Sequence, residues 1–241
     1  MNHNYETSIF SVQKSGNKEE ENEDAYAIGK NGNLIAISDG ASDSFSSRIW
    51  AQLLSQEFID KPIDFNNKEV FLAWLESIQQ KWLEKIDWEK LPWFMKEKAK
   101  GGDFASLLTL TISEERNRFI SYAIGDSCLF IIRENKCLTF PIEKSNEFNN
   151  YPYLISSHSK NNVHVFGKIK MLDCEIREND IIIMATDSMA KWILQEYEAG
   201  SDVSTQLTKM DSELFKDFVK GLRRSKELRN DDSTIILIKR S

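Results

Sequence analysis

The strongest constraint in the sequence is a hairpin signal between two acidic clusters. Two short apolar runs of strand type are joined by a turn rich in glycine and asparagine, at residues 25–28 and 34–37. Such a turn needs residues that accept positive φ. Folding the hairpin brings Glu23 and Asp24, before the first run, beside Asp39, which follows the second. Gly40 lacks a Cβ, so its carbonyl could approach a cation closely. The stretch therefore predicts half of a metal site.

Length and charge narrow the class of protein. With 241 residues, 41% of them hydrophobic and 29% charged, we expect one soluble globular domain spanning residues 1–241. The formal net charge of −7 argues against a nucleic-acid or anionic-membrane partner, because it would repel phosphate. We find no run of transmembrane length and no signal-peptide pattern.

The cysteines and histidines exclude other chemistries. Cys128, Cys137 and Cys174 are odd in number and lack metal-ligand spacing, so we expect buried free thiols in a reducing, cytoplasmic compartment. Three scattered histidines are too few for a zinc site of usual spacing.

One pattern recurs along the chain, an apolar strand with an aspartate at its carboxyl end. Asp39, Asp126 and Asp187 each follow such a run, at 34–37, 119–124 and 181–185. Asp231 instead precedes the run at 234–238, so it reaches the same sheet edge if that strand is antiparallel to its neighbour. Carboxylates gathered there would repel one another and raise their pKa values. Mg²⁺ or Mn²⁺ resolves that conflict with oxygen ligands.

The remaining apolar patterns predict the other elements. We expect an edge strand at 7–12, a helix running from a cap at Ser42 or Asp43 to Pro62, and further strands at 105–112, 118–124 and 128–133. Residues 141–170 read as an irregular loop with a strand at 163–169, followed by helices at 190–198 and 203–224.

A tryptophan-rich segment stands between the first helix and the strands. Residues 67–98 predict one long helix or two helices broken near Pro92, and they carry Trp74, Trp82, Trp88 and Trp93. These side chains form either the packing face of a helix or an aromatic docking surface for another protein.

Five motifs, in this order, resemble one known family. They are Asn22-Glu23-Asp24-Ala25, Ser38-Asp39-Gly40, Gly125-Asp126-Ser127, Ala185-Thr186-Asp187 and Asp231-Asp232-Ser233-Thr234. Together they are similar to the ordered motifs of the metal-dependent protein serine/threonine phosphatases of type 2C, over nearly the whole chain. The resemblance implies an α+β fold of four layers, a helix–sheet–sheet–helix sandwich with two packed antiparallel sheets. It also implies a centre of two Mn²⁺ or Mg²⁺ ions, with a weaker third.

The resemblance also implies a role for each motif residue. Asp39 would bridge the two metals, the Gly40 carbonyl would bind one, and Asp187 and Asp231 would hold the other. Glu23 would contact a metal through water, with Asp24 supporting the network, and Asp126 matches the aspartate of the third metal. The implied reaction is in-line attack on phosphorus by a metal-activated hydroxide, without a phosphoenzyme. The implied partner is a phosphorylated protein, a Ser/Thr kinase or its target, and we expect a monomer.

The chain departs from the family pattern in several places. Glu19 stands where the family has an arginine that clamps phosphate, so Lys18 or Lys14 would have to substitute, without the bidentate fork of arginine. Ala41-Ser42-Asp43 follows the Asp-Gly pair and lacks a histidine, which leaves His158 or water as the general acid. Ser188 replaces a usual glycine.

The loop at about 145–168 takes the place of the family's flap, and we expect it to influence substrate choice. Two alternatives stay open beside the protein phosphatase: a non-catalytic interaction module of the same fold, and a metal-dependent hydrolase of small phosphoesters.

Overall fold

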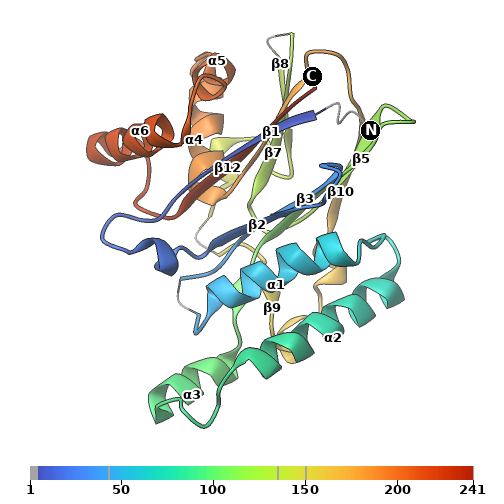
Figure 1. Cartoon of the computed structure of the whole chain (residues 1–241), viewed down its shortest axis with the longest axis vertical. Helices are drawn as coiled ribbons and strands as arrows, with labels where there is room; N and C mark the ends of the chain where they lie inside the picture. Colours follow the sequence, from blue (N-terminus) through green and yellow to red (C-terminus); the bar gives the residue numbers. More distant parts are fainter. Residues whose placement is uncertain (1–4, 43, 135, 150, 241) are drawn as a thin grey trace.

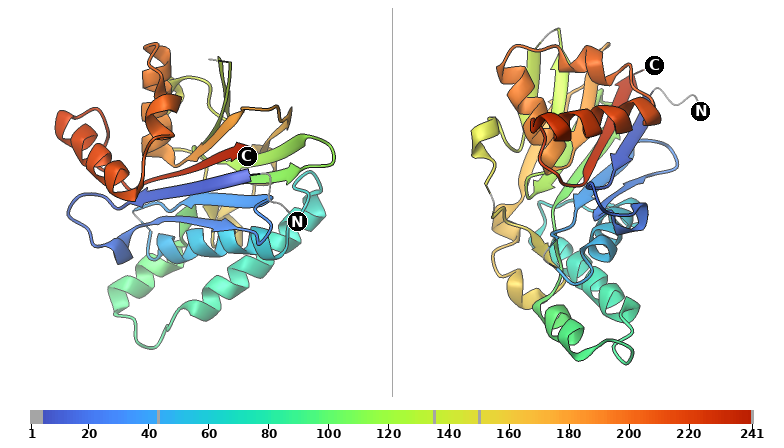
Figure 2. Two further views of the ribbon diagram at one scale, coloured as in Figure 1. Left: turned by 45° about the horizontal axis from the view of Figure 1, so that its top comes forward. Right: turned by 90° about the vertical axis from the view of Figure 1, so that its left-hand side faces the viewer.

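Two antiparallel sheets packed face to face form the centre of the molecule, and helices cover their outer faces (Figure 1). The computed structural model describes residues 5–42, 44–134, 136–149 and 151–240. The α+β sandwich of four layers that the resemblance implied is confirmed. The side view in Figure 2 shows the sheets between the two groups of helices.

The first sheet joins the chain's two terminal strands. Its order is β1 (Tyr5–Val12), β12 (Ser233–Arg240), β11 (Ile181–Ala185), β7 (Cys128–Arg133) and β8 (Lys136–Phe140). All its neighbours pair antiparallel, and β1 is an edge strand as expected.

The second sheet contains the predicted hairpin. Its order is β10 (Lys170–Glu175), β6 (Arg118–Ile124), β5 (Leu107–Ser113), β3 (Leu34–Asp39) and β2 (Asp24–Ile28). A two-residue pairing of β4 (Phe104–Ala105) with β9 (Ile155–Ser156) lies apart from it. Both large sheets follow from alternating and continuous apolar runs, which bury one face or both.

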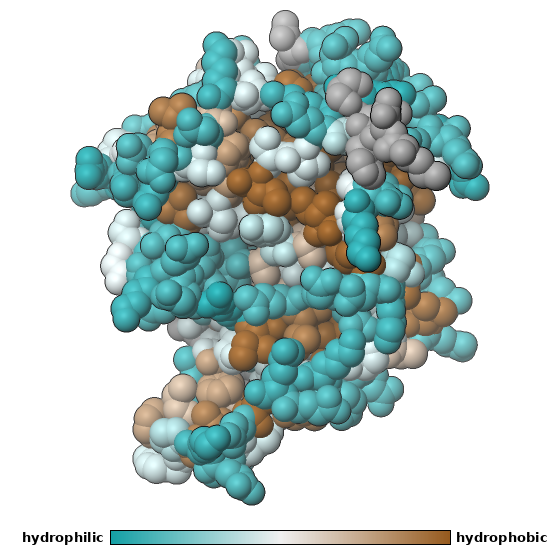
Figure 3. Space-filling model, viewed as in Figure 1, coloured by the Kyte–Doolittle hydropathy of each residue, from teal (hydrophilic) through white to brown (hydrophobic). Residues whose placement is uncertain are grey.

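Three apolar clusters fill the spaces between the four layers. One lies between the sheets, with Ile37, Leu110 and Met184. A second packs the sheet of β2 against α1 (Ser47–Asp60) and α2 (Lys68–Lys85), with α3 (Trp93–Gly101) continuing below them. The third packs the sheet of β1 against α4 (Asp187–Glu198), α5 (Val203–Leu207) and α6 (Ser212–Ser225). Hydrophilic side chains cover much of the outer surface, while hydrophobic ones show over the sheets (Figure 3).

Several element boundaries differ from the expectations. The helix expected at 203–224 is two helices, because Asp211 accepts bonds from Glu213 N and Leu214 N and starts α6 anew. The strand expected at 163–169 is wrong: that segment holds the 3₁₀ turn η4 (Phe166–Lys168), and the strand follows as β10. Helix α1 begins at Ser47 rather than after Ser42, and Asp43 lies outside the described residues. Strand β8 was not predicted.

The tryptophan-rich segment is two helices, with a break before Pro92, and three of its tryptophans pack inward. Trp74 and Trp82 are buried and Trp88 is half-buried, which supports the packing interpretation for them. Trp93 is 78% exposed. Of the free cysteines, Cys128 is buried as expected, but Cys137 and Cys174 are only half-buried, because they lie on the outer strands β8 and β10.

Other short segments connect these elements without extending the sheets. They are the 3₁₀ turns η1 (Glu19–Glu21), η2 (Ser145–Glu147) and η3 (Ser159–Asn161). Among the described residues no helix has both the length and the hydrophobicity to cross a membrane.

The apolar cluster between the sheets is where we expect truncation of a side chain to lower the free energy of unfolding most. Leu110→Ala, at a fully buried position, should lower the free energy of unfolding by about 2–5 kcal/mol through lost transfer energy and a cavity. Leu138→Ala, at a position 41% exposed on β8, is the matched control and should cost less than about 1 kcal/mol. Urea unfolding followed by circular dichroism measures both, and equal losses would contradict the assignment of the central core.

Candidate metal centre

The β2–β3 hairpin brings the first acidic cluster beside Asp39. Asp24 lies directly opposite Asp39 in the antiparallel pairing. The Gly40 amide donates to the Glu23 carbonyl at 3.3 Å, which continues the pairing of the two hairpin segments past the end of β3. A Cβ on Gly40 would lie 2.8 Å from the Ser47 Cβ, so no larger residue fits without a shift of α1.

The first sheet delivers two further aspartates to the same end of the sandwich. Strands β11 and β12 run antiparallel, with Ala185 opposite Ile235. The end of β11 therefore lies beside the start of β12, which places Asp187 and Asp231 at one edge, as the pattern predicted. Asp187 is the first residue of α4, where the helix dipole favours a negative charge.

Asp126 reaches this edge from the turn between β6 and β7. It follows Gly125, whose φ of 106° is a conformation that glycine adopts without strain. The Asp126 residue is buried, at 8% exposure. The backbone turn therefore directs a buried carboxyl group toward the other aspartates.

Side-chain hydrogen bonds join the two sheets at this end. Thr186 Oγ1 donates to Asp24 Oδ2 at 2.9 Å. Asp232 accepts from the backbone amides of Glu23 and Lys14, at 2.8 and 2.7 Å. Asp232 thus ties the entry of β2 to the exit of β1. Its positional role was not predicted, because it appeared in the sequence only as the neighbour of Asp231.

The Glu23 carboxylate is fixed by two hydroxyl groups. Ser47 Oγ donates to Oε1 at 2.5 Å and Ser42 Oγ donates to Oε2 at 2.6 Å. Lys14 Nζ lies 3.5 Å from the same Oε2. Lys14, one of the two lysines considered from sequence, is therefore at this site.

Crowding changes the acidity of the aspartates. Burial, followed by the charges of Asp187, Asp24, Asp126 and Asp231, raises the pKa of Asp39 well above its ordinary value. Burial, followed by the charge of Asp231, raises the pKa of Asp187. Burial first, and then Asp187, raise the pKa of Asp126 to about 7. Electrostatic coupling thus shows that these carboxyl groups from both sheets share one environment.

The donors at this edge fit a hard divalent cation. They are carboxylate oxygens and backbone carbonyls, which suit Mg²⁺ or Mn²⁺. Asp24 Oδ1 is out of solvent contact and finds no hydrogen-bond partner in the described part of the chain, so it has an unused lone pair. Within the same residues, no three His, Cys, Asp or Glu side chains already form a closed ligand set. A cation bound at this edge would therefore require the aspartates to move.

An arginine that sequence analysis missed lies among these aspartates. Arg229, in the loop before β12, places Nη2 at 3.0 Å from Asp231 Oδ2 and Nη1 at 3.8 Å from Asp187 Oδ2. Its side chain is 69% exposed. Nothing in the local sequence distinguishes it from a loop arginine, so only the fold could have identified it.

Among the described residues, the side chains of the two other residues predicted to contact substrate, His158 and Lys18, make no hydrogen bond or ion pair with the aspartates. His158 packs edge-on against Trp82, with 5.4 Å between ring centroids, and its Nε2 is 3.2 Å from the Ala99 carbonyl oxygen. It belongs to the α2–α3 packing and is not brought to the aspartates. Lys18 is exposed before η1, where its amide donates to Glu21 at 2.7 Å. Ser188 is accommodated by a bond from its hydroxyl group to the Asp232 carbonyl at 2.7 Å.

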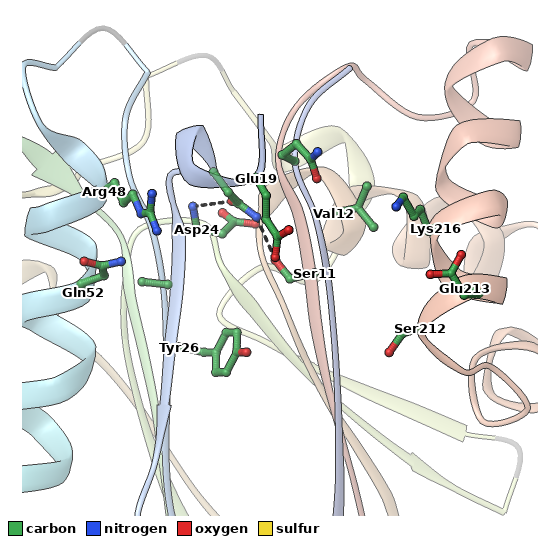
Figure 4. Close-up of a pocket in the computed structure, with 13 residues that line it drawn as sticks. Ser11, Val12, Glu19, Asp24, Tyr26, Arg48, Gln52, Ser212, Glu213 and Lys216 are labelled. Atoms are coloured by element: carbon green, nitrogen blue, oxygen red, sulfur yellow. Dashed lines mark hydrogen bonds between the residues drawn. The ribbon is translucent and has the colours of Figure 1, made fainter. Parts of the chain in front are cut away.

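Two cavities adjoin the aspartates. One, of about 610 Å³, lies between the edge strands β1 and β2 and is lined by Asp24, with Glu19 also at its wall (Figure 4). The other, of about 560 Å³, is lined by Asp126 and Asp187 and is bounded by α4, residues 148–149 and the loop between α6 and β12.

Comparison with known proteins assigns the family. Residues 14–228 match the family described as protein phosphatase 2C, so the chain belongs to the protein phosphatase 2C family. Comparison with curated proteins finds no match.

Solved structures share the fold at low identity. The catalytic domain of the serine/threonine protein phosphatase PstP, in complex with two manganese ions, matches at 14% identity and a TM-score of 0.64, covering 98% of this chain and 97% of that one. Stp1 from Staphylococcus aureus matches at 14% identity and a TM-score of 0.64, covering 97% of this chain and 94% of that one. PppA, described as a regulatory component of T6SS in Pseudomonas aeruginosa, matches at 14% identity and a TM-score of 0.61, covering 98% of this chain and 97% of that one.

The raised pKa of Asp126 predicts how the metal-free protein responds to pH. The folded state holds this proton up to about pH 7, whereas an unfolded aspartate releases it near its ordinary pKa of 3.8. The stabilisation is therefore complete below about pH 4 and is lost as the pH rises through 7. In EDTA, raising the pH from 4 to 8 should cost on the order of 3 kcal/mol of unfolding free energy through this group.

Asp126→Asn tests that assignment, because the amide does not titrate. Urea unfolding at pH 4, 5, 6, 7 and 8 should give a flatter stability profile for the variant than for the wild type. Parallel profiles would place the pH dependence on other groups.

Proposed function

We propose that this protein is a metal-dependent hydrolase of phosphoserine and phosphothreonine in other proteins, with residues 1–241 forming one catalytic domain. The observation that supports it most is the placement of Asp39, Asp126, Asp187 and Asp231 at one end of the sandwich, delivered by both sheets. Family membership supports the reaction class.

Six groups would hold the metals in this proposal. Asp39, the Gly40 carbonyl, Asp187 and Asp231 would bind two ions directly, Glu23 would bind through water, and Asp126 would hold a third ion. When bound, Mn²⁺ or Mg²⁺ supplies an activated water for in-line attack on phosphorus and neutralises charge on the phosphoryl oxygens. A similar structure that contains two manganese ions supports this choice of cofactor.

The surrounding side chains would keep the ligands in place. Ser42 and Ser47 fix both oxygens of Glu23, so its water would be held at one position. Thr186 leaves only one Asp24 oxygen unpartnered, and that oxygen can support the same network. Water, rather than His158, would then protonate the leaving serine or threonine alkoxide oxygen, because His158 is engaged at Ala99.

Partners and location complete the proposal. The substrates would be proteins phosphorylated by a Ser/Thr kinase, or the kinase itself, encountered by a monomer in the cytoplasm. Three cysteines without a disulfide partner among the described residues support a reducing compartment.

Hydrolysis of a phosphothreonine peptide with Mn²⁺, with Mg²⁺ and with EDTA tests the proposal. We expect turnover that needs metal and a higher kcat/KM for the peptide than for a small phosphoester. Preference for the small ester would indicate the small-phosphoester hydrolase. No turnover with any metal would refute the proposed activity and favour the non-catalytic interaction module.

Two substitutions test the ligand assignment. Asp39→Asn and Asp187→Asn should each lower kcat at least about 100-fold, because each removes a carboxylate that would hold metal. Each should also leave the metal-free fold as stable or more stable, since a repelling charge is removed. Asp173→Asn, at an exposed position on β10, is the control and should retain activity. Full activity of either test variant would place the site elsewhere.

A further inference from the structure

The cavity beside Asp126 and Asp187 has a basic rim. Lys191 on α4, and Lys226 and Arg229 in the loop after α6, line it with exposed side chains. In the described part of the chain, the ammonium groups of Lys191 and Lys226 have no ion-pair or hydrogen-bond partner. We name this space the basic cavity. Its cations are conspicuous in a chain whose formal net charge is −7.

The acidic residues of the basic cavity are mostly the proposed metal ligands. Asp126 and Asp187 would have their charge offset by bound cations, which leaves Glu227 as the remaining acid of the lining. A fourth cation, Arg223, is already engaged, because it donates to the carbonyls of Gln13 and Asp231. The unpaired positive charge therefore resides on Lys191 and Lys226, while Arg229 is paired with Asp231 and Asp187.

The other cavity lacks this excess. Its cations, Arg48 from α1 and Lys216 from α6, face each other across the gap between β1 and β2 (Figure 4). They are balanced by Glu19 and Glu213 in the same lining, without counting Asp24, which belongs to the proposed metal centre. In addition, the Arg48 guanidinium donates to the Glu20 carbonyl. A polyanionic ligand is therefore favoured in the basic cavity and not in this one.

Arg229 is placed to exchange partners. Its guanidinium contacts Asp231 and Asp187, which are the carboxylates that a cation would claim. The side chain is largely exposed, and such ion pairs contribute at most about 1 kcal/mol, so releasing it costs little. A guanidinium also matches a phosphate with two parallel hydrogen bonds, which an ammonium cannot provide.

We propose that the basic cavity receives the substrate segment around the phosphorylated residue, that Arg229 binds the phosphate, and that Lys191 and Lys226 select acidic flanking residues. The substrate class is therefore phosphoproteins with glutamate or aspartate beside the phosphoserine or phosphothreonine. This inference rests on the proposed function, whose reaction it does not change.

The first experiment varies the charge of the substrate. Three phosphothreonine peptides of equal length carry glutamate, glutamine or lysine at the flanking positions, and kcat/KM is measured with Mn²⁺. The wild type should prefer the glutamate peptide to the glutamine peptide by about 3- to 10-fold, because Lys191 and Lys226 each add a modest attraction that solvent screens. Lys226→Glu and Lys191→Glu should each abolish or reverse that preference.

A matched control separates local from overall charge. Lys216→Glu changes the net charge by the same amount, but the residue lines the other cavity. It should keep the preference of the wild type. An equal loss of preference in Lys216→Glu and Lys226→Glu would overturn the assignment to the basic cavity.

The second experiment measures phosphate binding without turnover. Inorganic phosphate is titrated calorimetrically into the Mn²⁺-loaded protein. Arg229→Ala should weaken phosphate binding about 10-fold or more, and Arg229→Lys should restore only part of it. Mn²⁺ affinity of Arg229→Ala, measured in the same way, should be unchanged or tighter, because a competing cation is gone. Unchanged phosphate affinity would overturn the role of Arg229.

The outcomes distinguish this inference from the proposed function. Metal-dependent turnover with equal kcat/KM for all three peptides would overturn the inference and leave the phosphatase activity standing. If no peptide is turned over, the proposed activity fails. Fluorescence anisotropy of the labelled peptides with the Mn²⁺-loaded protein then decides: tighter binding of the glutamate peptide, lost in Lys226→Glu, supports the cavity, and binding independent of charge refutes it.

Discussion

Mutual repulsion among buried carboxyl groups is the interaction on which the candidate site depends. Asp39, Asp126 and Asp187 come from three different connections and from both sheets, yet the pKa of each is raised by burial and by the charge of a neighbouring aspartate. Carboxyl groups so placed must share protons, pair with a cation or bind metal. The structure shows the second, in the ion pair between Arg229 and Asp231. Metal binding is the third and is the proposal.

The sandwich tolerates this repulsion between carboxyl groups because apolar packing away from the site stabilises the fold. Apolar clusters between the sheets and under both helix layers hold the strands, so strand ends can carry charges that oppose one another. Local devices then fix individual groups: Asp232 ties β1 to β2, and serine hydroxyls fix Glu23. The candidate site thereby lies at one end of the fold, and the packing that stabilises the fold does not depend on the site.

The sequence predicted those parts of the site that short local sequence patterns specify. An apolar run followed by an aspartate specifies a strand and its end, so Asp39 and Asp187 could be placed before the fold was known. Arg229 could not, because its contact with Asp231 depends on how one loop folds back over the edge of the sheet. His158 was considered for lack of a nearer histidine, but it packs against Trp82 and contacts the Ala99 carbonyl of α3 instead. The metal roles themselves stay predictions.

Anomalous diffraction from crystals grown with Mn²⁺ tests whether these carboxylates bind metal. We expect two strong manganese peaks at the end of the sandwich, held by Asp39, the Gly40 carbonyl, Asp187 and Asp231, with Arg229 displaced from the two carboxylates. Peaks absent from this edge at saturating Mn²⁺, with the Arg229 ion pairs intact, would contradict it.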